Sequence, residues 1–192
     1  RFRRLLPASA VALVVTALIY TAVAGPGDAA ASVGAFRASF LYVANWYFVR
    51  ESAGYFGADV AQNPVLQFWS LAIEEQFYLV WPLLLTGLFA LAKRAKWQAE
   101  GVVRIVLSVA TLASLAWALS LQGTDPDRAY YGTDARAYQL LAGALLALTP
   151  SVVTRVKGLG RATVAVSAAA TVGIVALATS AVDVGPITRG AL

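Results

Sequence analysis

Long apolar runs, separated by short polar or basic stretches, dominate the chain. Runs of roughly 18 or more apolar residues are typical of helices that cross a lipid bilayer. Such runs or close approaches to them occur at 5–24, 66–92, 102–121, 137–148 and 162–182. The pattern predicts an all-α protein, a polytopic transmembrane helical bundle with about five full spans.

The segment 35–49 is apolar too, but it is rich in aromatic residues and about 15 residues long, too short for an upright span. It predicts one short re-entrant or interfacial helix. The stretch 50–64 carries Gly54, Gly57 and Asp59 and predicts a loop, and 122–136 predicts a charged loop.

Charge predicts how these spans are oriented. Basic loops prefer the cytoplasm, which places the clusters 1–4, 93–104 and 155–161 inside and the loops 25–59 and 122–136 outside. An even number of crossings must then separate the first two clusters, so 35–49 does not cross fully. Three crossings with a broken charge rule remain the alternative.

Composition excludes several classes of protein. Hydrophobic residues make up 59% of the chain and charged residues only 13%, against about 25% in soluble domains. The net charge is +5, but the basic residues flank apolar runs, which favours orientation in a bilayer over nucleic-acid binding. With no Cys and no His, no thiolate or imidazole metal site is expected. The absence of Met and the basic start predict that 1–192 is an internal piece of a single membrane domain.

Two carboxylates, Glu74 and Glu75, lie inside a predicted span. A carboxylate there is costly and is a functional hypothesis by default. On a helix Glu74 shares a face with Ser70 and Tyr78, whereas Glu75 points about 100° away. The pair therefore does not act face to face, and we expect one carboxylate to be buried while the other meets solvent or an Arg. The alternative is that both solvate a helix start, with Trp69 in an interfacial belt.

A second polar cluster begins the run 137–148. Thr133 or Asp134 is predicted to cap the helix. Arg136 in the first turn is unfavourable to the helix dipole and therefore predicts an anionic partner. The candidates are Glu74, Glu75 and Asp134.

The basic start contains Arg1 and Arg4, three residues apart and before Pro7. It reads either as an orientation signal that binds anionic membrane lipid or as an anion site for a phosphorylated donor, since guanidinium groups bind phosphate with two hydrogen bonds.

These clusters occur together in one order: RFRRLLP at 1–7, WSLAIEEQFYL at 69–79, and YGTDAR at 131–136 followed by LLAGA at 140–144. In this the chain resembles membrane acyltransferase family 3, the bacterial integral-membrane O-acyltransferases. The string at 69–79 is the most specific of the three, and the resemblance covers nearly the whole chain.

The resemblance implies acetyl-CoA or another acyl-CoA as donor and a glycan hydroxyl as acceptor, in a polysaccharide, peptidoglycan or a lipid-linked sugar. It implies a multi-pass protein of the bacterial inner membrane. The family's donor motif maps to Arg1 and Arg4, and its intramembrane glutamate maps to Glu74. Acyl transfer also needs donors for the developing oxyanion, and Arg136, Trp69 or Tyr78 could supply them. We therefore expect Glu74 and Arg136 to be catalytic. The expected substrate-binding residues are Trp69, Ser70, Glu75, Tyr78, Tyr131 and Asp134.

Two departures from the family matter. Its presumed catalytic His lies on an upstream span, and this chain has no His; where many members have a His before Phe-Trp-Ser-Leu, this chain has Gln67. A chain lacking that base is not expected to turn over alone. A non-enzymatic transporter subunit using Glu74 and Arg136 as a substrate or proton site is the alternative function, and a scaffold for a fused extracytoplasmic domain is a weaker one.

Overall fold

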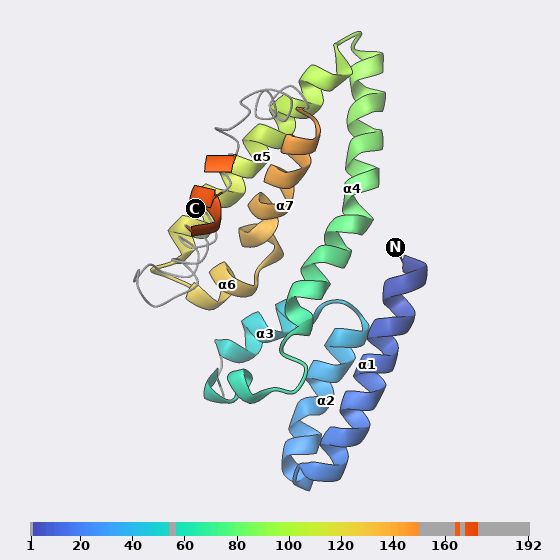
Figure 1. Ribbon diagram of the computed structural model, residues 1–192, viewed down its shortest axis with the longest axis vertical. Coiled ribbons are helices and arrows are strands. Elements are labelled where there is room, and N and C mark those ends of the chain that lie inside the picture. The colour runs from blue at the N-terminus through green and yellow to red at the C-terminus, as the bar shows by residue number, and fades with distance from the viewer. Residues whose placement is uncertain (1, 54–56, 150–163, 166–167, 173–192) are drawn as a thin grey trace. The chain divides into compact units, whose positions relative to one another are not determined.

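The computed structural model describes residues 2–53, 57–149, 164–165 and 168–172, and every regular element in this part of the chain is a helix (Figure 1). The elements are α1 (Phe2–Val23), α2 (Pro26–Phe40), α3 (Ala44–Ser52), the 3-10 helix η1 (Gly57–Gln62), α4 (Phe68–Arg94), α5 (Ala99–Leu121), α6 (Pro126–Tyr131) and α7 (Thr133–Ala147). They form two compact units. The first holds 1–84 and 125–133, and the second holds 85–124 and the described residues from Asp134 on.

Three of the described helices are long and apolar enough to cross a membrane: Arg3–Val23 of α1, α4 and α5. At 1.5 Å per residue α1 is about 33 Å long, which matches the roughly 30 Å of a bilayer core. The all-α prediction is confirmed for the described residues. The predicted count of five spans is not: α7 has only 15 residues, and the run 162–182 falls largely outside the described residues.

The prediction of a single short helix at 35–49 is wrong. Two helices occupy this region, α2 and α3, with a turn at 41–43 between them. α2 also begins at Pro26, directly after the predicted break, because Gly25 provides an extended N-cap and Pro is well suited to the first helical turn. The predicted outer loop is therefore mostly helical.

The turn after α2 is a Schellman motif. The Val43 N–H donates to the Ala38 carbonyl at 2.9 Å, and the Tyr42 N–H donates to the Ser39 carbonyl at 3.1 Å. Tyr42 has φ of 54°. Glycine usually occupies this left-handed conformation, which costs other residues about 1–2 kcal/mol. Because no glycine marks this turn, it could not be predicted from the local residue pattern.

The predicted loop at 122–136 contains a helix as well. Asp125 is the N-cap of α6, and its carboxylate accepts from the Arg128 N–H at 3.1 Å. Pro126 follows at the first helical position. Asp followed by Pro at these positions is a recognised helix start. The prediction of a loop at 122–136 did not take this local signal into account.

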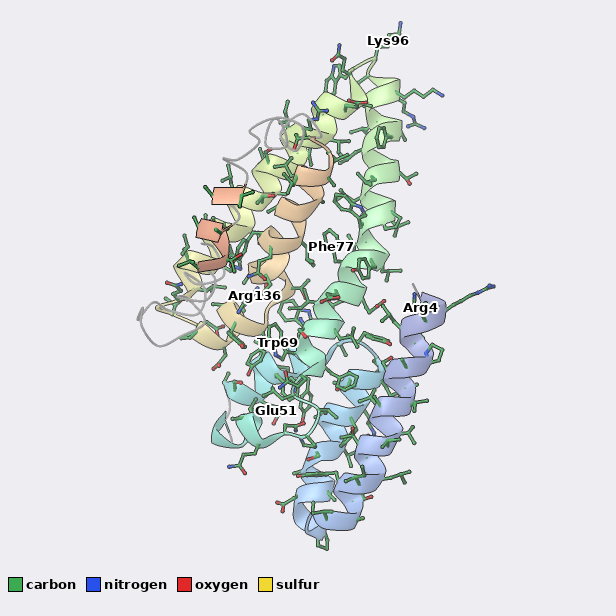
Figure 2. All side chains as sticks on the ribbon, viewed as in Figure 1. Arg4, Glu51, Trp69, Phe77, Lys96 and Arg136 are labelled. Carbon is green, nitrogen blue, oxygen red and sulfur yellow. The ribbon has the colours of Figure 1, made fainter. Side chains whose placement is uncertain are left out.

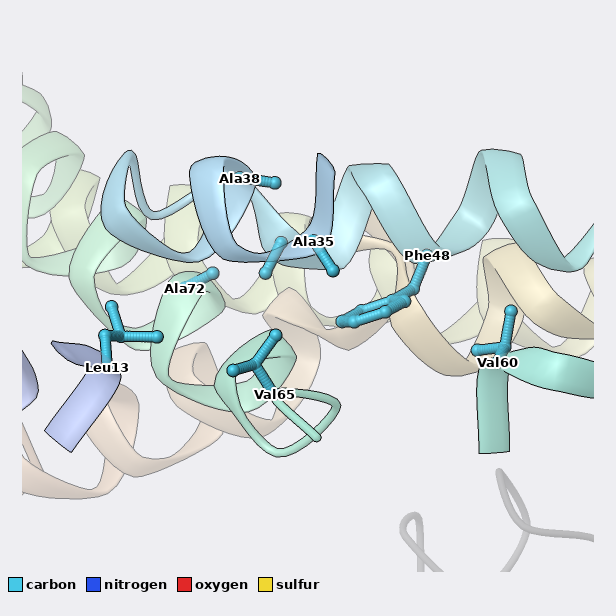
Figure 3. Close-up of a cluster of buried hydrophobic side chains, with 8 residues drawn as sticks. Leu13, Ala35, Ala38, Phe48, Val60, Val65 and Ala72 are labelled. Atoms are coloured by element: carbon cyan, nitrogen blue, oxygen red, sulfur yellow. The ribbon is translucent and has the colours of Figure 1, made fainter. Parts of the chain in front are cut away.

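The core of the first unit joins α1, α2, α3, η1 and α4, and half of its buried members are alanines. Its buried members are Leu13, Ala35, Ala38, Ala44, Phe48, Val60, Val65 and Ala72 (Figure 3). Alanines at the contacts let helix backbones approach closely, which is how helices pack when lipid removes much of the hydrophobic driving force. Large apolar side chains such as Leu18, Ile19 and Leu83 remain exposed, as expected where a helix faces lipid or another membrane helix.

The two left-handed residues provide a matched test. Lys96 also has positive φ (55°) and ends α4 in the same motif, with the Trp97 N–H 2.9 Å from the Ala92 carbonyl, but its side chain is exposed. Lys96→Gly should raise the apparent free energy of unfolding by up to about 1 kcal/mol, because glycine adopts this conformation without strain. Tyr42→Gly should lower it, because the side chain packs against the core. Thermal unfolding of the full-length protein in detergent measures both. Equal shifts in the same direction would show that Tyr42 serves the turn alone.

Candidate functional site

A closed network of hydrogen bonds joins distant parts of the first unit. At its centre is Asn45, which is 0% exposed. Its amide Nδ2 donates to the Tyr131 carbonyl at 3.1 Å and to the Thr133 hydroxyl at 2.8 Å. Its amide Oδ1 accepts from Gln76 Nε2 at 2.9 Å. The Asn45 side chain thus holds Tyr131 and Thr133, which follow it by 86 and 88 residues in the sequence.

Gln76 closes the network. Its second amide proton goes to the Tyr42 carbonyl at 2.8 Å, and its Oε1 accepts from the Thr133 hydroxyl at 2.6 Å. Both amide orientations are determined, because a flipped Asn45 or Gln76 would place its oxygen against a backbone carbonyl. Every amide proton in the network has an acceptor. We call Tyr42, Asn45, Gln76 and Thr133 the polar hub.

The hub extends to α1 through the Tyr42 side chain. The Tyr42 and Ser9 hydroxyl oxygens lie 2.5 Å apart. The single Ser9 hydroxyl proton donates to the Leu6 carbonyl at 3.1 Å, so the Tyr42 hydroxyl donates to Ser9. The strained Tyr42 backbone therefore supports two contacts at once, its hydroxyl on α1 and its carbonyl on α4.

Glu75, the residue before Gln76, is buried too, but one of its carboxylate oxygens has no hydrogen-bond partner among the described residues. It is 5% exposed, and the oxygen without a partner is Oε1. A buried polar oxygen without a partner costs about 1–3 kcal/mol, and more when charged. The sequence predicted that one carboxylate would be buried and the other exposed. The structure buries Glu75 and exposes Glu74.

The residues that share a face with Glu74 are turned outward or are engaged locally. Ser70 is exposed, and its hydroxyl donates to the Gln67 carbonyl within the same turn at 3.1 Å. Further along α4, Phe77 stacks on Trp81 with ring centroids 5.1 Å apart and contacts Tyr78 edge-on. Within the described residues this face is thus aromatic and accessible, while the face of Gln76 carries the hub.

Trp69 and Tyr131, both predicted to bind substrate, pack against each other. Their ring centroids lie 5.4 Å apart edge-on, and Tyr130 lies 5.0 Å from Trp69 and 4.9 Å from Tyr131. Phe48 adds a fourth ring 6.1 Å from Tyr131. Burial raises the pKa of Tyr131 above its usual value, with smaller contributions from Tyr130 and Asp127, so its phenol stays a protonated donor at neutral pH. Trp69 stands at the start of α4 in Figure 2.

The basic start of α1 remains accessible. Arg1 lies outside the described residues. Arg3 and Arg4 are exposed, and Arg4 extends away from the helices (Figure 2). Neither forms an ion pair with a described residue, so both guanidinium groups are available to an anion.

In the second unit, the first turn of α7 is bound to α5. Asp134 does not cap α7: it lies inside the helix, and its carboxylate accepts from the Trp117 indole N–H at 2.9 Å. The Ser114 hydroxyl donates to the Asp134 carbonyl at 2.6 Å and accepts from the Tyr138 N–H at 3.0 Å. It thus bridges two groups that an α-helix normally joins directly. Thr133, the other predicted cap, also lies inside α7, and its hydroxyl belongs to the hub.

Arg136 is buried in the second unit, at 9% exposed. A guanidinium is rarely buried unless it is paired or functional, so its burial agrees with the prediction that it has a partner. Which carboxylate pairs with it stays a prediction. In the part of the chain that the structure describes, no group of three or more acidic residues is placed to hold a metal ion.

Sequence reasoning did not find the hub. Asn45 is a lone amide in an aromatic segment, and Gln76 directly follows two carboxylates, which are the stronger functional signal in a predicted span. The available signal was Gln76, an uncharged amide inside a predicted span, which a bilayer disfavours unless the amide is hydrogen-bonded. The pairing of Gln76 with Asn45 was not predictable, because it depends on how α3 and α4 pack.

The fold and this site together define a class of protein. Helices able to span a bilayer, together with a buried amide at Asn45 and a buried carboxylate at Glu75, are the features of an integral membrane protein with an internal polar site.

Comparison with known proteins narrows the class. The chain is 42% identical over 149 residues to the peptidoglycan O-acetyltransferase OatA of Listeria monocytogenes, a match that covers 77% of this chain and 23% of the relative. It is 37% identical over 158 residues, with the same coverage, to YrhL of Bacillus subtilis, whose name provisionally assigns peptidoglycan O-acetylation. A Staphylococcus aureus protein named provisionally as an O-acetyltransferase is 38% identical over 111 residues, which covers 57% of this chain and 18% of the relative.

Over about three quarters of its length the chain is homologous to these O-acetyltransferases, which confirms the resemblance found in its motifs. It spans about a quarter of the length of these relatives. No family profile matches the chain, and no solved structure matches it.

Two glutamines on either side of the start of α4 test the hub. Gln76→Leu should lower the apparent free energy of unfolding by about 3 kcal/mol, because it leaves Asn45 Oδ1, the Tyr42 carbonyl and the Thr133 hydroxyl each short of a partner. Gln67→Leu is the control, since Gln67 is exposed and its side chain makes no hydrogen bond with a described residue. Thermal unfolding of the full-length protein in detergent measures both. Similar melting temperatures for the two variants would contradict the network.

Proposed function

We propose that this chain contributes to a multi-pass bacterial inner-membrane O-acyltransferase that moves an acetyl group from acetyl-CoA to a hydroxyl of a cell-surface glycan. The support comes from its relatives, one of which is named for the O-acetylation of peptidoglycan. Peptidoglycan is accordingly the acceptor that we favour. The observation on which the site assignment depends is the buried Glu75 with an unpartnered carboxylate oxygen.

The reaction sets the groups that the site requires. A glycan hydroxyl oxygen attacks the thioester carbonyl carbon, the C–S bond breaks, and the CoA sulfur leaves as a thiolate that takes up a proton. The hydroxyl proton must go to a base, and the oxyanion that forms on the carbonyl needs hydrogen-bond donors. No imidazole is available from this chain, which has no His.

Glu75 supports this chemistry better than Glu74. A buried carboxylate with a free lone pair can orient an imidazole base or accept a hydrogen bond from the attacking hydroxyl. Fixed neighbours hold it in place, since Gln76 is fully hydrogen-bonded and cannot turn without breaking the hub. Glu74 is exposed among the described residues and is the second candidate for this role.

The remaining roles follow from charge. Arg4, together with Arg1 three residues earlier in the sequence, supplies guanidinium groups for the phosphates of CoA, which they bind with paired hydrogen bonds. Arg136 is the fixed positive charge that we assign to the developing oxyanion, because a buried guanidinium acts in a medium of low dielectric constant where its field is strong.

Isosteric substitutions distinguish the two carboxylates. In the full-length protein in membranes, Glu75→Gln should lower kcat for acetyl transfer by about 100-fold or more, the usual contribution of a group acting in proton transfer. Glu74→Gln should change it less than tenfold, and Arg136→Ala should abolish transfer. Radiolabelled acetyl-CoA and isolated glycan measure the rates.

The control is Glu100→Gln, which removes a carboxylate from an exposed ion pair with Arg104 in the second unit. Equal expression and melting temperature exclude a loss of fold. A larger loss in Glu74→Gln than in Glu75→Gln would transfer the role to Glu74, and full activity in both would remove the carboxylates from the mechanism.

A further inference from the structure

A pocket of about 730 Å³ lies in the first unit, away from Glu75. Four elements line it: the last turn of α1, the first half of α2, the middle and end of α3, and the end of η1. Its volume falls within the roughly 300–1,000 Å³ of ligand sites. Glu51, labelled in Figure 2, marks its α3 side.

The polar side chains of this pocket contrast with the hub. Six of them make no side-chain hydrogen bond with any described residue: Tyr20, Asp28, Ser32, Tyr47, Glu51 and Gln62. Ser32 is only 5% exposed, so the pocket is the main space open to its hydroxyl. The hub, in the same unit, leaves no amide proton unused. The pocket therefore presents hydrogen-bonding capacity that the protein itself does not use.

The charge of the lining restricts what can bind. Asp28 and Glu51 are carboxylates, and no Arg, Lys or His is among the described lining residues. An anionic ligand would be repelled, whereas hydroxyl groups would find strong acceptors. The acidic pair is too small a ligand set for a metal among the described residues. A ligand rich in uncharged hydroxyl groups fits this lining.

Tyr47 supplies a donor and an aromatic face. Burial raises the pKa of its phenol, the nearby Glu51 carboxylate adds to this, and Arg50 opposes it, so the phenol keeps its proton. Its place depends on Gly34 of α2: a Cβ on that residue would lie 2.8 Å from the Tyr47 hydroxyl and 2.9 Å from its ring. Phe48 and Val60 close the apolar side. Donors, acceptors and apolar surface together suit a pyranose ring.

The pocket also lies at a suitable end of α1. Tyr20 and Val23 at the end of α1 and Ala24 just after it line the pocket, and Arg4 stands at the other end of this helix. The charge pattern predicts Arg4 inside the cell, so a helix of about 33 Å places the pocket at the outer surface. Glycans of the cell envelope are on that side.

We propose that this pocket is a binding subsite for an uncharged sugar unit of the acceptor glycan, separate from the reacting carboxylate. The proposal rests on the proposed function for its acceptor. It assigns Asp28 and Glu51 as acceptors for sugar hydroxyls and Tyr47 as donor and ring contact.

Binding without chemistry provides the direct test. Calorimetry on full-length protein in detergent would use an uncharged N-acetylglucosamine oligomer and a carboxylate-bearing oligosaccharide of the same length. Wild type should bind the anionic oligosaccharide at least tenfold more weakly than the uncharged oligomer. Asp28→Asn with Glu51→Gln should weaken binding of the uncharged oligomer at least tenfold, and Glu100→Gln should leave it unchanged.

A second variant tests the shape of the pocket independently of its charge. Gly34→Ala forces the Tyr47 ring to move and should raise KM for glycan at least fivefold with kcat within twofold of wild type. The subsite is overturned if the doubly neutralised variant binds as wild type, or if the anionic oligosaccharide binds equally well. A wild-type protein that binds the oligomer in this pattern but transfers no acetyl group would overturn the proposed function and leave the pocket as a glycan site.

Discussion

The first unit depends on one constraint: the N–H groups of the Asn45 and Gln76 side-chain amides, which lie between packed helices, must be hydrogen-bonded within the protein. Asn45 and Gln76 meet this requirement only together, through Thr133 and the carbonyls of Tyr42 and Tyr131. Because water and lipid offer no substitute in such a place, the network fixes α3, α4 and the residues after α6 in a single register. The left-handed backbone of Tyr42 is strain that this network offsets.

In our account the polar groups of this unit fall into two kinds: those whose hydrogen bonds are made within the protein serve the fold, and those without a partner serve function. Every amide proton of the hub already has an acceptor within the protein, so the hub serves the fold. Glu75, one residue away, keeps an unpartnered carboxylate oxygen, and the pocket lined by Asp28 and Glu51 keeps a set of unused side chains. A rigid, saturated network beside unsatisfied groups is the arrangement that positions reacting atoms with little reorganisation. In our account the reacting carboxylate and the glycan subsite are separate places on this one scaffold.

Sequence predicted what depends on local pattern. The spans at α1, α4 and α5 follow from apolar length, and the family follows from three motifs. Helix geometry also predicted that Glu74 and Glu75 face different ways. It could not say which one is buried, because that depends on the packing of α4 against segments remote in sequence. The division of 35–49 into α2 and α3 was missed because Tyr42 occupies a position where glycine is the usual signal, and the hub was missed because neither amide reveals its partner.

The central claim is that Asn45 and Thr133, 88 residues apart, act as one unit. A double-mutant cycle of Asn45→Ala and Thr133→Ala, read as the apparent free energy of unfolding of full-length protein in detergent, tests it most directly. Each single substitution should leave groups of the network without a hydrogen-bond partner. The loss of unfolding free energy in the double variant should therefore be smaller than the sum of the two single losses, by about 1–3 kcal/mol. Effects that add to within about 0.5 kcal/mol, as distant sites do, would contradict the account.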